Sequence, residues 1–374
     1  MQLTTKYALT AAALLFSLQS QATTIETEQG AIQVTTITEG LEHPWGLAFL
    51  PDGRMLVTER TGTMRYVSAD GKTSEPLQGL PDILVNGQGG LLDVVLAPDF
   101  ADSKQIYFSY NEPASSGGGS SSTAVARAIL NGQQLEQLEV IFSAQPKMTS
   151  RAHFGSRLVF TDDGYLFITL GDRGSRRDDA QTLDTHHGKV VRLYPDGRIP
   201  ASNPYVGKDG ALDEIWSYGH RNIQGAALHP ETHQLWTHEH GPQGGDEINI
   251  AEASKNYGWP VITYGEEYGG GVIGKTHKEG MEQPLHEWTP SIAPSGMAFY
   301  TGDLFTGWQG DLLVGALRHQ LIARLVLDGN SVAHEERIDL GMRIRDVRQG
   351  PDGAVYLLTD ERNGKVLKLT PATE

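Results

Sequence analysis

One pattern recurs six times along this chain and constrains its fold more than any other feature. In each copy an apolar run leads into a turn built on Pro, Asp or Gly, and a second apolar run follows. Each copy is typical of a β-hairpin with a short turn. The turns fall near residues 52, 99, 163, 230, 302 and 352. A repeat of roughly 40–50 residues is the signature of propeller blades, and wider spacings imply long loops on one face.

We therefore predict an all-β fold, namely a single six-bladed β-propeller over residues 23–374 with four-stranded antiparallel blades. The alternative is a set of β-sandwich domains, but no linker-like boundary separates the repeats. Helix signals are weak because Gly and Pro recur too often for long amphipathic helices. In a propeller the long loops surround the mouth of the central channel, and function is expected there.

Charge and cysteine content exclude several classes of function. The formal net charge is −16 at pH 7, and the chain contains no cysteine. A strongly acidic surface argues against nucleic acid and anionic membrane as partners. Without cysteine there is no disulfide scaffold, no thiol nucleophile and no Cys-based zinc or iron–sulfur site.

Residues 1–22 have the layout of a cleaved secretory signal peptide. Lys6 supplies a positive charge, an apolar stretch runs from Tyr7 to Leu18, and a small-x-small cleavage pattern ends at Ala22. The alternative is a membrane anchor, but the apolar stretch is shorter than the ~20 residues that span a bilayer. We predict a periplasmic or secreted protein with no membrane insertion.

Four arginines lie in segments that flank predicted blade strands: Arg221, Arg318, Arg343 and Arg345. Arg343 and Arg345 alternate, so on a strand both side chains point to one face. Arginines that converge in an acidic protein suit a polyanionic ligand, because the planar guanidinium pairs bidentately with carboxylates. Ion pairing with surface Asp and Glu is the alternative that the spacing leaves open.

His153 comes just before one predicted strand, and Asp172 comes just after its partner strand. The two side chains could therefore meet at one end of the same hairpin. A carboxylate that holds a neutral imidazole makes a general base near neutral pH. A purely structural histidine is the alternative, and the chain has 13 histidines.

Asp246 and Glu247 lie in a Gly-rich turn. Carboxylates and free backbone carbonyls in such turns suit a hard cation such as calcium, and a solvated acidic turn is the alternative. His238 and His240 lie close by, but no compact set of three ligands with an open position follows, so zinc is not favoured.

Ten short motifs, taken in order, resemble the soluble pyrroloquinoline quinone (PQQ)-dependent sugar dehydrogenases, and most closely their aldose sugar dehydrogenase branch. The likeness runs from about Leu41 to Leu369. Each motif is weak alone, whereas the ordered set is specific. The motifs are Glu42–Leu47, Gly87–Leu91, His153–Leu158, Gly171–Gly174, Gly219–Asn222, His238–Pro242, Asp246–Asn249, Tyr257–Pro260, Ala293–Gly296 and Arg343–Asp346.

The resemblance implies a role for each matching position. His153 would be the general base and Asp172 its orienting partner. The carbonyls of Gly241 and Pro242 would bind a calcium ion that bridges to the cofactor. The residues that would hold or line the quinone are Gln88, Arg221, Asn222, Tyr268, Ser291, Arg318, Arg343 and Arg345. A second, structural calcium would be held by Glu247 and Tyr257.

The resemblance also implies a reaction. PQQ and calcium would be the cofactors, and calcium would polarise the quinone carbonyl as a Lewis acid. His153 would remove the anomeric hydroxyl proton of an aldose while the C1 hydride passes to the quinone. The products would be an aldonolactone and a quinol, which passes its electrons to an external acceptor. Loops shorter than those of the glucose dehydrogenase branch favour a monomer.

Three positions depart from the family pattern. Ile223 follows Asn222 where Pro is common, which we expect to shift the Arg221–Asn222 loop slightly. Ser156 stands where the family often has Gly, which we expect to be harmless. Arg318 stands near a position where soluble glucose dehydrogenase uses Lys, so the charge is kept but not the geometry.

Two rival interpretations belong to other functional classes. A calcium-dependent propeller hydrolase that acts on sugar lactones would need acidic ligands at the channel mouth, but no arginine cluster. A non-catalytic sugar-binding propeller would need no His153–Asp172 pair.

Overall fold

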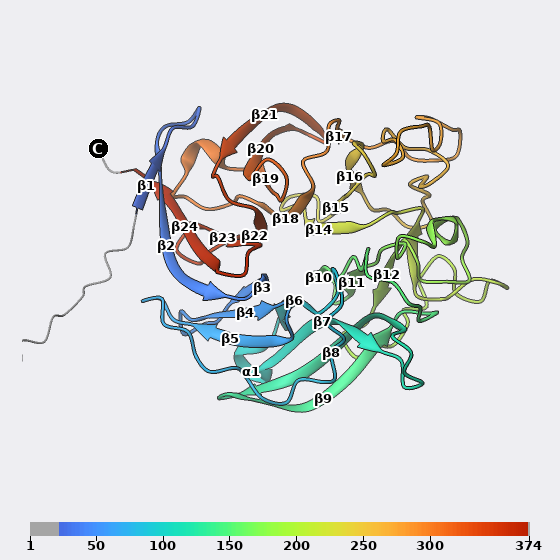
Figure 1. Cartoon of the computed structure of the whole chain (residues 1–374), viewed down its shortest axis with the longest axis horizontal. Helices are drawn as coiled ribbons and strands as arrows, with labels where there is room; N and C mark the ends of the chain where they lie inside the picture. The colour runs from blue at the N-terminus through green and yellow to red at the C-terminus, as the bar shows by residue number, and fades with distance from the viewer. Residues whose placement is uncertain (1–21, 373–374) are drawn as a thin grey trace, which may run out of the picture.

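The chain forms six β-sheets that follow one another around a ring, as Figure 1 shows. The computed structural model describes residues 22–372. Four sheets have four strands, one has three and one has five, and all neighbouring strands are antiparallel. The predicted six-bladed propeller is thereby confirmed, with four strands as the common number. The predicted signal peptide lies outside the described residues, except that Ala22 begins β1. Within residues 22–372, no helix is long and apolar enough to cross a membrane.

The six predicted hairpins are the first two strands of the six blades. They pair β3 (Pro44–Phe49) with β4 (Met55–Glu59), β6 (Leu91–Leu96) with β7 (Gln105–Pro113), β10 (Leu158–Phe160) with β11 (Leu166–Thr169), β14 (Ile223–Leu228) with β15 (Leu235–Glu239), β18 (Pro294–Phe299) with β19 (Leu312–Ala316), and β22 (Ile344–Gln349) with β23 (Val355–Thr359). Short helical turns lie inside two of these hairpins: α1 (Phe100–Ser103) after β6 and η2 (Thr306–Trp308) after β18.

Outer strands complete the blades. They are β5 (Thr63–Val67), β8 (Ser121–Asn131), β9 (Gln134–Ser143), β12 (Lys189–Leu193), β13 (Ile215–Tyr218), β16 (Asp246–Ile250), β17 (His286–Trp288), β20 (Leu321–Asp328), β21 (Ser331–Asp339) and β24 (Gly364–Pro371). A short 3₁₀ helix, η1 (Arg177–Gln181), lies in the long loop between β11 and β12.

The ring closes through a strand from the other end of the chain. β2 (Ile32–Leu41) pairs with β24, from Ile32 opposite Pro371 to Leu41 opposite Gly364. β1 (Ala22–Ile25) then adds a fifth strand to this blade, and Figure 1 shows β1, β2 and β24 side by side. The last blade therefore combines strands from both ends of the chain. This pairing closes the ring and covers a sheet edge that would otherwise be open.

The hydrophobic core lies between neighbouring blades. One cluster joins Leu56 of β4 to Phe108 of β7, and another joins Trp236 of β15 to Leu312 of β19. Strands in the middle of a blade are covered on both faces, so they are apolar along their length instead of alternating. Because both faces of these strands are buried, the repeats contain continuous apolar runs in the sequence.

The first strands of the six blades, β3, β6, β10, β14, β18 and β22, lie next to one another around the central channel. Glycine permits two of the close approaches. A Cβ on Gly46 would lie 3.0 Å from an Asp93 carboxylate oxygen, and a Cβ on Gly296 would lie 2.3 Å from one of Asp346. The loops that precede these strands open on one end of the channel, and the hairpin turns lie at the opposite end. The predicted site residues belong to the first end.

Candidate active site

A cavity of about 300 Å³ lies at the mouth of the central channel. Trp45 of β3, Gln88 before β6, Asn222 before β14 and Arg345 of β22 contribute to its wall, so at least four blades build it. Four of the eight predicted cofactor-binding residues, namely Gln88, Asn222, Arg343 and Arg345, therefore line one cavity although they are far apart in sequence. The fold achieves this because each of them is placed at the same end of a blade.

His153 and Asp172 meet as the sequence predicts. His153 Nδ1 lies 2.6 Å from Asp172 Oδ1, and Trp259 Nε1 donates to the other carboxylate oxygen at 2.7 Å. Gln88 accepts a hydrogen bond at 2.8 Å from the backbone N–H of His153. His153 adopts a positive φ of 54°, an uncommon conformation for a residue with a side chain. The hydrogen-bond network assigns the proton to Nδ1 and leaves the Nε2 lone pair available as a base.

The Asp172 carboxylate stays ionised despite its deep burial. Burial alone would raise its pKa, but the hydrogen bond to His153, the nearby charge of Arg221 and the hydrogen bond from the Gly174 N–H outweigh that effect and lower it. An ionised Asp172 both holds the imidazole ring and stabilises the imidazolium that forms when His153 takes a proton.

Arg343 and Arg345 converge on one carboxylate. Each donates from Nη2 to Asp360 Oδ2, at 3.2 and 3.0 Å, which agrees with their predicted position on one strand face. Arg345 also donates to Gln224 Oε1 at 3.1 Å, and its Nε is buried without a hydrogen-bond partner.

The sequence analysis missed Asp360. Burial would raise its pKa, but the charge and hydrogen bond of Arg345, helped by His43 and Arg343, hold the pKa well below its usual range. A positional signal existed, because Glu59, Asp172 and Glu239 also stand where the second strand of a blade ends. An acidic residue at the end of the second strand of a blade could therefore have been predicted to lie at the channel mouth.

Arg221 lies deeper than the other mouth arginines. Its Nη1 donates to the carbonyls of His240 and Gly241 at 2.9 and 2.8 Å, while its Nε is buried without a partner. The guanidinium also stacks over the Trp259 ring, 5.2 Å from its centroid. Asn222 Oδ1 accepts from the Gly155 N–H at 3.2 Å.

Three of the predicted residues lie in a neighbouring cavity of about 610 Å³, which shares His240 and Ala293 with the first. Arg318 lines it and is exposed. Tyr268 is 72% exposed, and its hydroxyl accepts from Arg221 Nη2 at 3.4 Å. Ser291 donates its hydroxyl to Asp246 at 2.7 Å. The predicted quinone-binding residues are therefore divided between these two cavities, except Arg221, which lines a third cavity.

His240 and Trp45 also line the cavity, although the sequence did not predict this position for either residue. Burial, together with the charges of Arg221 and Arg345, lowers the pKa of His240 to about 3, so its ring is neutral. Its Nε2 bonds to the Pro294 carbonyl at 2.6 Å. Trp45 lies in one of the family motifs, and its ring centroid is 5.8 Å from the Arg345 guanidinium.

The predicted metal ligands lie around two spaces. Gly241 and Pro242 both line the 610 Å³ cavity, and the Gly241 carbonyl accepts a hydrogen bond from Arg221. Glu247 and Tyr257 line a third cavity of about 10 Å³ together with Glu239. Burial and the neighbouring Glu239 raise the pKa of Glu247 well above its usual value. The Tyr257 hydroxyl donates to the Ile250 carbonyl and so is already engaged. In the part of the chain that the structure describes, no three acidic or histidine side chains form a ready metal cluster.

A second charged cluster lies deeper in the channel, and we call Asp93, Arg157, Asp346 and Arg348 the channel quartet. Arg157 pairs with Asp93 at 3.2 Å and Asp346 at 3.0 Å, and Arg348 pairs with the same two residues at 2.9 Å each. Arg157 also donates to the Gln224 carbonyl at 2.7 Å. The quartet therefore joins β6 and β22 to Arg157, which directly precedes β10, and Arg157 reaches β14.

Comparison with known proteins identifies the family of this chain. The family model for glucose/sorbosone dehydrogenases matches residues 41–368. This chain belongs to that family. It is 47% identical to the aldose sugar dehydrogenase YliI of Escherichia coli over 346 residues, which cover 91% of this chain and 93% of the relative. As a member of the sugar dehydrogenase family it is an oxidoreductase, which confirms the predicted enzyme class.

Solved structures of the family have the same fold. The crystal structure of the soluble aldose sugar dehydrogenase of Escherichia coli in the apo form is 46% identical, with a TM-score of 0.88, over 91% of this chain and 100% of that one. The PQQ-bound aldose sugar dehydrogenase of Streptomyces coelicolor is 28% identical, with a TM-score of 0.75, over 94% of this chain and 99% of that one.

One position that departs from the family pattern has an uncommon backbone conformation. Ser156 has a φ of 97°, a region that favours glycine. Its backbone is held there by hydrogen bonds to the Thr169 carbonyl at 2.7 Å and from the Ser109 hydroxyl at 2.7 Å. A Gly at this position would adopt the conformation without strain, which gives a physical reason for the family preference.

Proposed function

We propose that this protein is an exported, PQQ- and calcium-dependent dehydrogenase that oxidises the C1 hydroxyl of aldose sugars to aldonolactones. The observation that carries the proposal is the oriented His153–Asp172 pair beside a cluster of arginines whose charge is only partly neutralised. A base alone would suit many enzymes. A base next to excess guanidinium charge suits oxidation at a polycarboxylate cofactor.

The mouth residues fit PQQ, which carries three carboxylates. Arg343 and Arg345 share a single carboxylate partner, Asp360, and Arg221 donates to two backbone carbonyls, so positive charge is left over for a ligand. The Nε atoms of Arg221 and Arg345 are buried without partners, and such donors are costly unless something accepts from them. When bound, PQQ supplies the two-electron acceptor that takes the C1 hydride.

The chain's own residues supply the proton chemistry. Asp172 keeps the proton of His153 on Nδ1, so Nε2 can take the proton of the anomeric hydroxyl. The C1 hydrogen leaves with its electron pair, and a carbonyl forms at C1. His153 then returns the proton to solvent, and the electrons pass to an external acceptor.

Calcium has two proposed places. Glu247 and Glu239 line one small cavity, where two buried carboxylates repel each other and a hard cation would relieve the repulsion. The Gly241 and Pro242 carbonyls would serve the cofactor-bridging ion, which requires Arg221 to give up or share the Gly241 carbonyl. Residues 1–22 are proposed to direct the chain to the periplasm or beyond, where it acts as a monomer.

The proposal is tested by adding calcium and PQQ to the purified apo protein and following the reduction of an artificial electron acceptor with a panel of aldoses. We expect sugar-dependent turnover that requires PQQ. His153→Ala should lower kcat by ~10²–10⁴-fold while PQQ still binds, and His277→Ala, which changes an exposed histidine, serves as the matched control. Turnover of His153→Ala close to wild type would refute the assignment of the base.

A further inference from the structure

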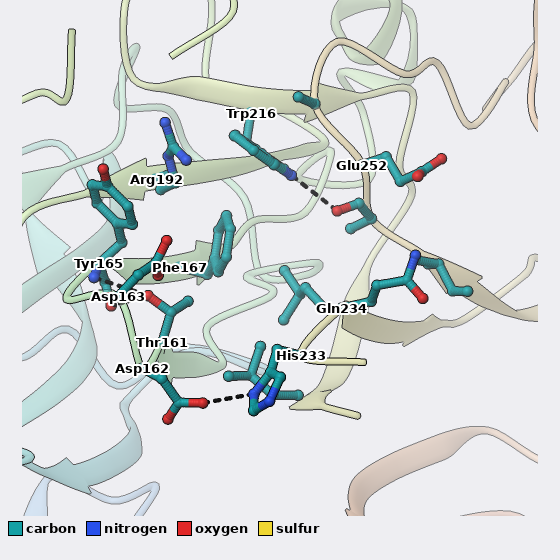
Figure 2. A pocket seen from close by; sticks show the side chains of 15 residues that line it. Thr161, Asp162, Asp163, Tyr165, Phe167, Arg192, Trp216, His233, Gln234 and Glu252 are labelled. Atoms are coloured by element: carbon teal, nitrogen blue, oxygen red, sulfur yellow. Dashed lines mark hydrogen bonds and ion pairs between the residues drawn. The ribbon is translucent and has the colours of Figure 1, made fainter. Parts of the chain in front are cut away.

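A cavity of about 550 Å³ lies at the end of the propeller opposite the candidate active site. Its wall includes the turn between β10 and β11 and the turn between β14 and β15. His153 and Arg221 precede these same two blades at the other end of the strands. Figure 2 shows the cavity with the side chains that line it.

The floor of this far-end cavity is aromatic and held rigidly. The Arg192 guanidinium stacks over two rings, 4.4 Å from the Tyr165 centroid and 4.3 Å from that of Trp216. Arg192 is itself fixed by Asn203 Oδ1 at 2.8 Å and a second hydrogen bond from Nη2 to Ser202. Figure 2 shows Arg192 between Tyr165 and Trp216, with Phe167 below them. The Arg192 guanidinium thus holds the two rings in place through cation–π contacts.

The apolar part of the floor is not fully covered. Trp216 packs edge-on against Phe167 with the ring centroids 5.4 Å apart, yet Trp216 is only half-buried. Its Nε1 donates to the Ala251 carbonyl at 2.9 Å, so the polar edge of the indole is satisfied while apolar ring surface still faces the cavity. An exposed but ordered aromatic surface inside a cavity is typical of a binding site.

The rim carries polar groups with free hydrogen-bonding capacity. The side chains of Asp163, Gln234 and Glu252 make no hydrogen bond with any residue between 22 and 372, and neither does the Tyr165 hydroxyl. Asp162 pairs with His233 at 2.6 Å, and Figure 2 marks this contact across the two turns. The rim therefore presents acceptors on two carboxylates and donors on an amide and a phenol.

We propose that this far-end cavity is a binding site for a neutral saccharide, separate from the site of oxidation. Sugar hydroxyls both donate and accept hydrogen bonds, which matches a rim that holds both kinds of partner. The C–H face of a pyranose ring suits an apolar aromatic floor. An anionic ligand would meet the carboxylates of Asp163 and Glu252, and a cationic ligand would meet Arg192. The volume admits one or two sugar rings.

Hydrogen–deuterium exchange of the full chain, with and without glucose or maltose, locates the binding. The proposal predicts sugar-dependent protection of peptides that cover 161–167, 233–235 and 250–253. The double variant Asp163→Ala/Glu252→Ala should weaken this protection, with a half-saturating sugar concentration at least about tenfold higher, because two hydrogen bonds to charged acceptors are lost. Its turnover with PQQ should equal that of the wild type.

Asp209→Ala/Glu279→Ala is the matched control, because it removes the same charge from exposed positions outside the cavity. The control variant should show the same sugar-dependent protection from exchange as the wild type. All three proteins should have the same thermal midpoint. Protection confined to the channel mouth, or far-end protection that survives in the Asp163→Ala/Glu252→Ala variant, would overturn the proposal. Either outcome leaves the proposed oxidation at the mouth unaffected, because that activity is measured separately.

Discussion

Two groups of charged residues occupy the same channel and differ in the ratio of arginines to carboxylates. In the channel quartet, two arginines face two carboxylates, and every guanidinium is paired. At the mouth, Arg343 and Arg345 share one carboxylate partner, Asp360, while Arg221 donates to the carbonyls of His240 and Gly241, and the Nε atoms of Arg221 and Arg345 are buried without a partner. Both groups are rich in arginine, so composition alone does not separate them.

Structural charges and ligand-binding charges can be distinguished by whether each buried charge has a partner. A buried ion pair that is complete is neutral and needs nothing further, whereas an incomplete one leaves desolvated charge that a ligand must satisfy. The quartet joins the blades around the channel, and the mouth cluster sits on top of it. The same strand, β22, contributes Arg345 to one group and Asp346 to the other.

The largest effect is expected when the quartet is made incomplete. Arg157→Met leaves two buried carboxylates with Arg348 alone, and breaking a buried pair by removing one partner costs about 3–5 kcal/mol. Urea denaturation should show this loss of stability in the free energy of unfolding. Arg198→Met, at a surface pair with Asp196 whose arginine is 75% exposed, should cost at most ~1 kcal/mol. Equal losses in the two variants would show that the quartet is not a stabilising unit.

An intermediate effect is expected when Arg343 and Arg345 lose the carboxylate that they share. Asp360→Asn should lower stability by about 1–3 kcal/mol at pH 7, because Arg343, Arg345 and His43 lose their shared partner. The folded pKa of Asp360 is depressed, so its stabilisation is present above about pH 4 and is lost as the pH falls further towards the folded pKa.

The unfolding free energies of wild type and Asp360→Asn, measured by urea denaturation between pH 7 and pH 3, should therefore converge as the pH falls. A difference that stays constant over this range would mean that the Asp360 charge is not what stabilises the mouth.

The smallest effect concerns the backbone that links the two groups, since Ser156 lies between His153 of the mouth and Arg157 of the quartet. Ser156→Gly removes the strain of a positive φ at a residue with a side chain, but it also removes the Ser156 hydrogen bond to the Phe154 carbonyl at 3.1 Å. We expect a net stabilisation of up to about 1 kcal/mol, read as a rise in the thermal midpoint. A clear fall in the midpoint would show that the hydroxyl matters more than the backbone strain.

The sequence predicts the fold well because each blade repeats the same local signal. All six predicted turns lie between the first two strands of a blade. An apolar run, a short turn and a second apolar run strongly favour a β-hairpin. The strand β2 was not predicted, because its partner β24 lies at the other end of the chain. Pairing over that separation leaves no local trace in the sequence.

The candidate site was predicted only in part, for a similar reason. His153, Asp172, Arg343 and Arg345 stand at strand ends and could be placed by register. Asp360 was missed because its role depends on the two arginines that converge on it. The hydrogen bond from Arg221 to the Gly241 carbonyl depends on how two loops pack, and so does the far-end cavity between two blades.

The most direct test of the comparison is a calorimetric titration of apo protein with PQQ in the presence of calcium, for wild type, Arg345→Met and Arg348→Met. The two arginines are three residues apart on β22, one in the mouth and one in the quartet. We predict that Arg345→Met binds PQQ at least about tenfold more weakly with a thermal midpoint near that of the wild type. Arg348→Met should keep the dissociation constant and lose thermal stability. Wild-type affinity in Arg345→Met, or an equal loss of affinity in both variants, would contradict the account.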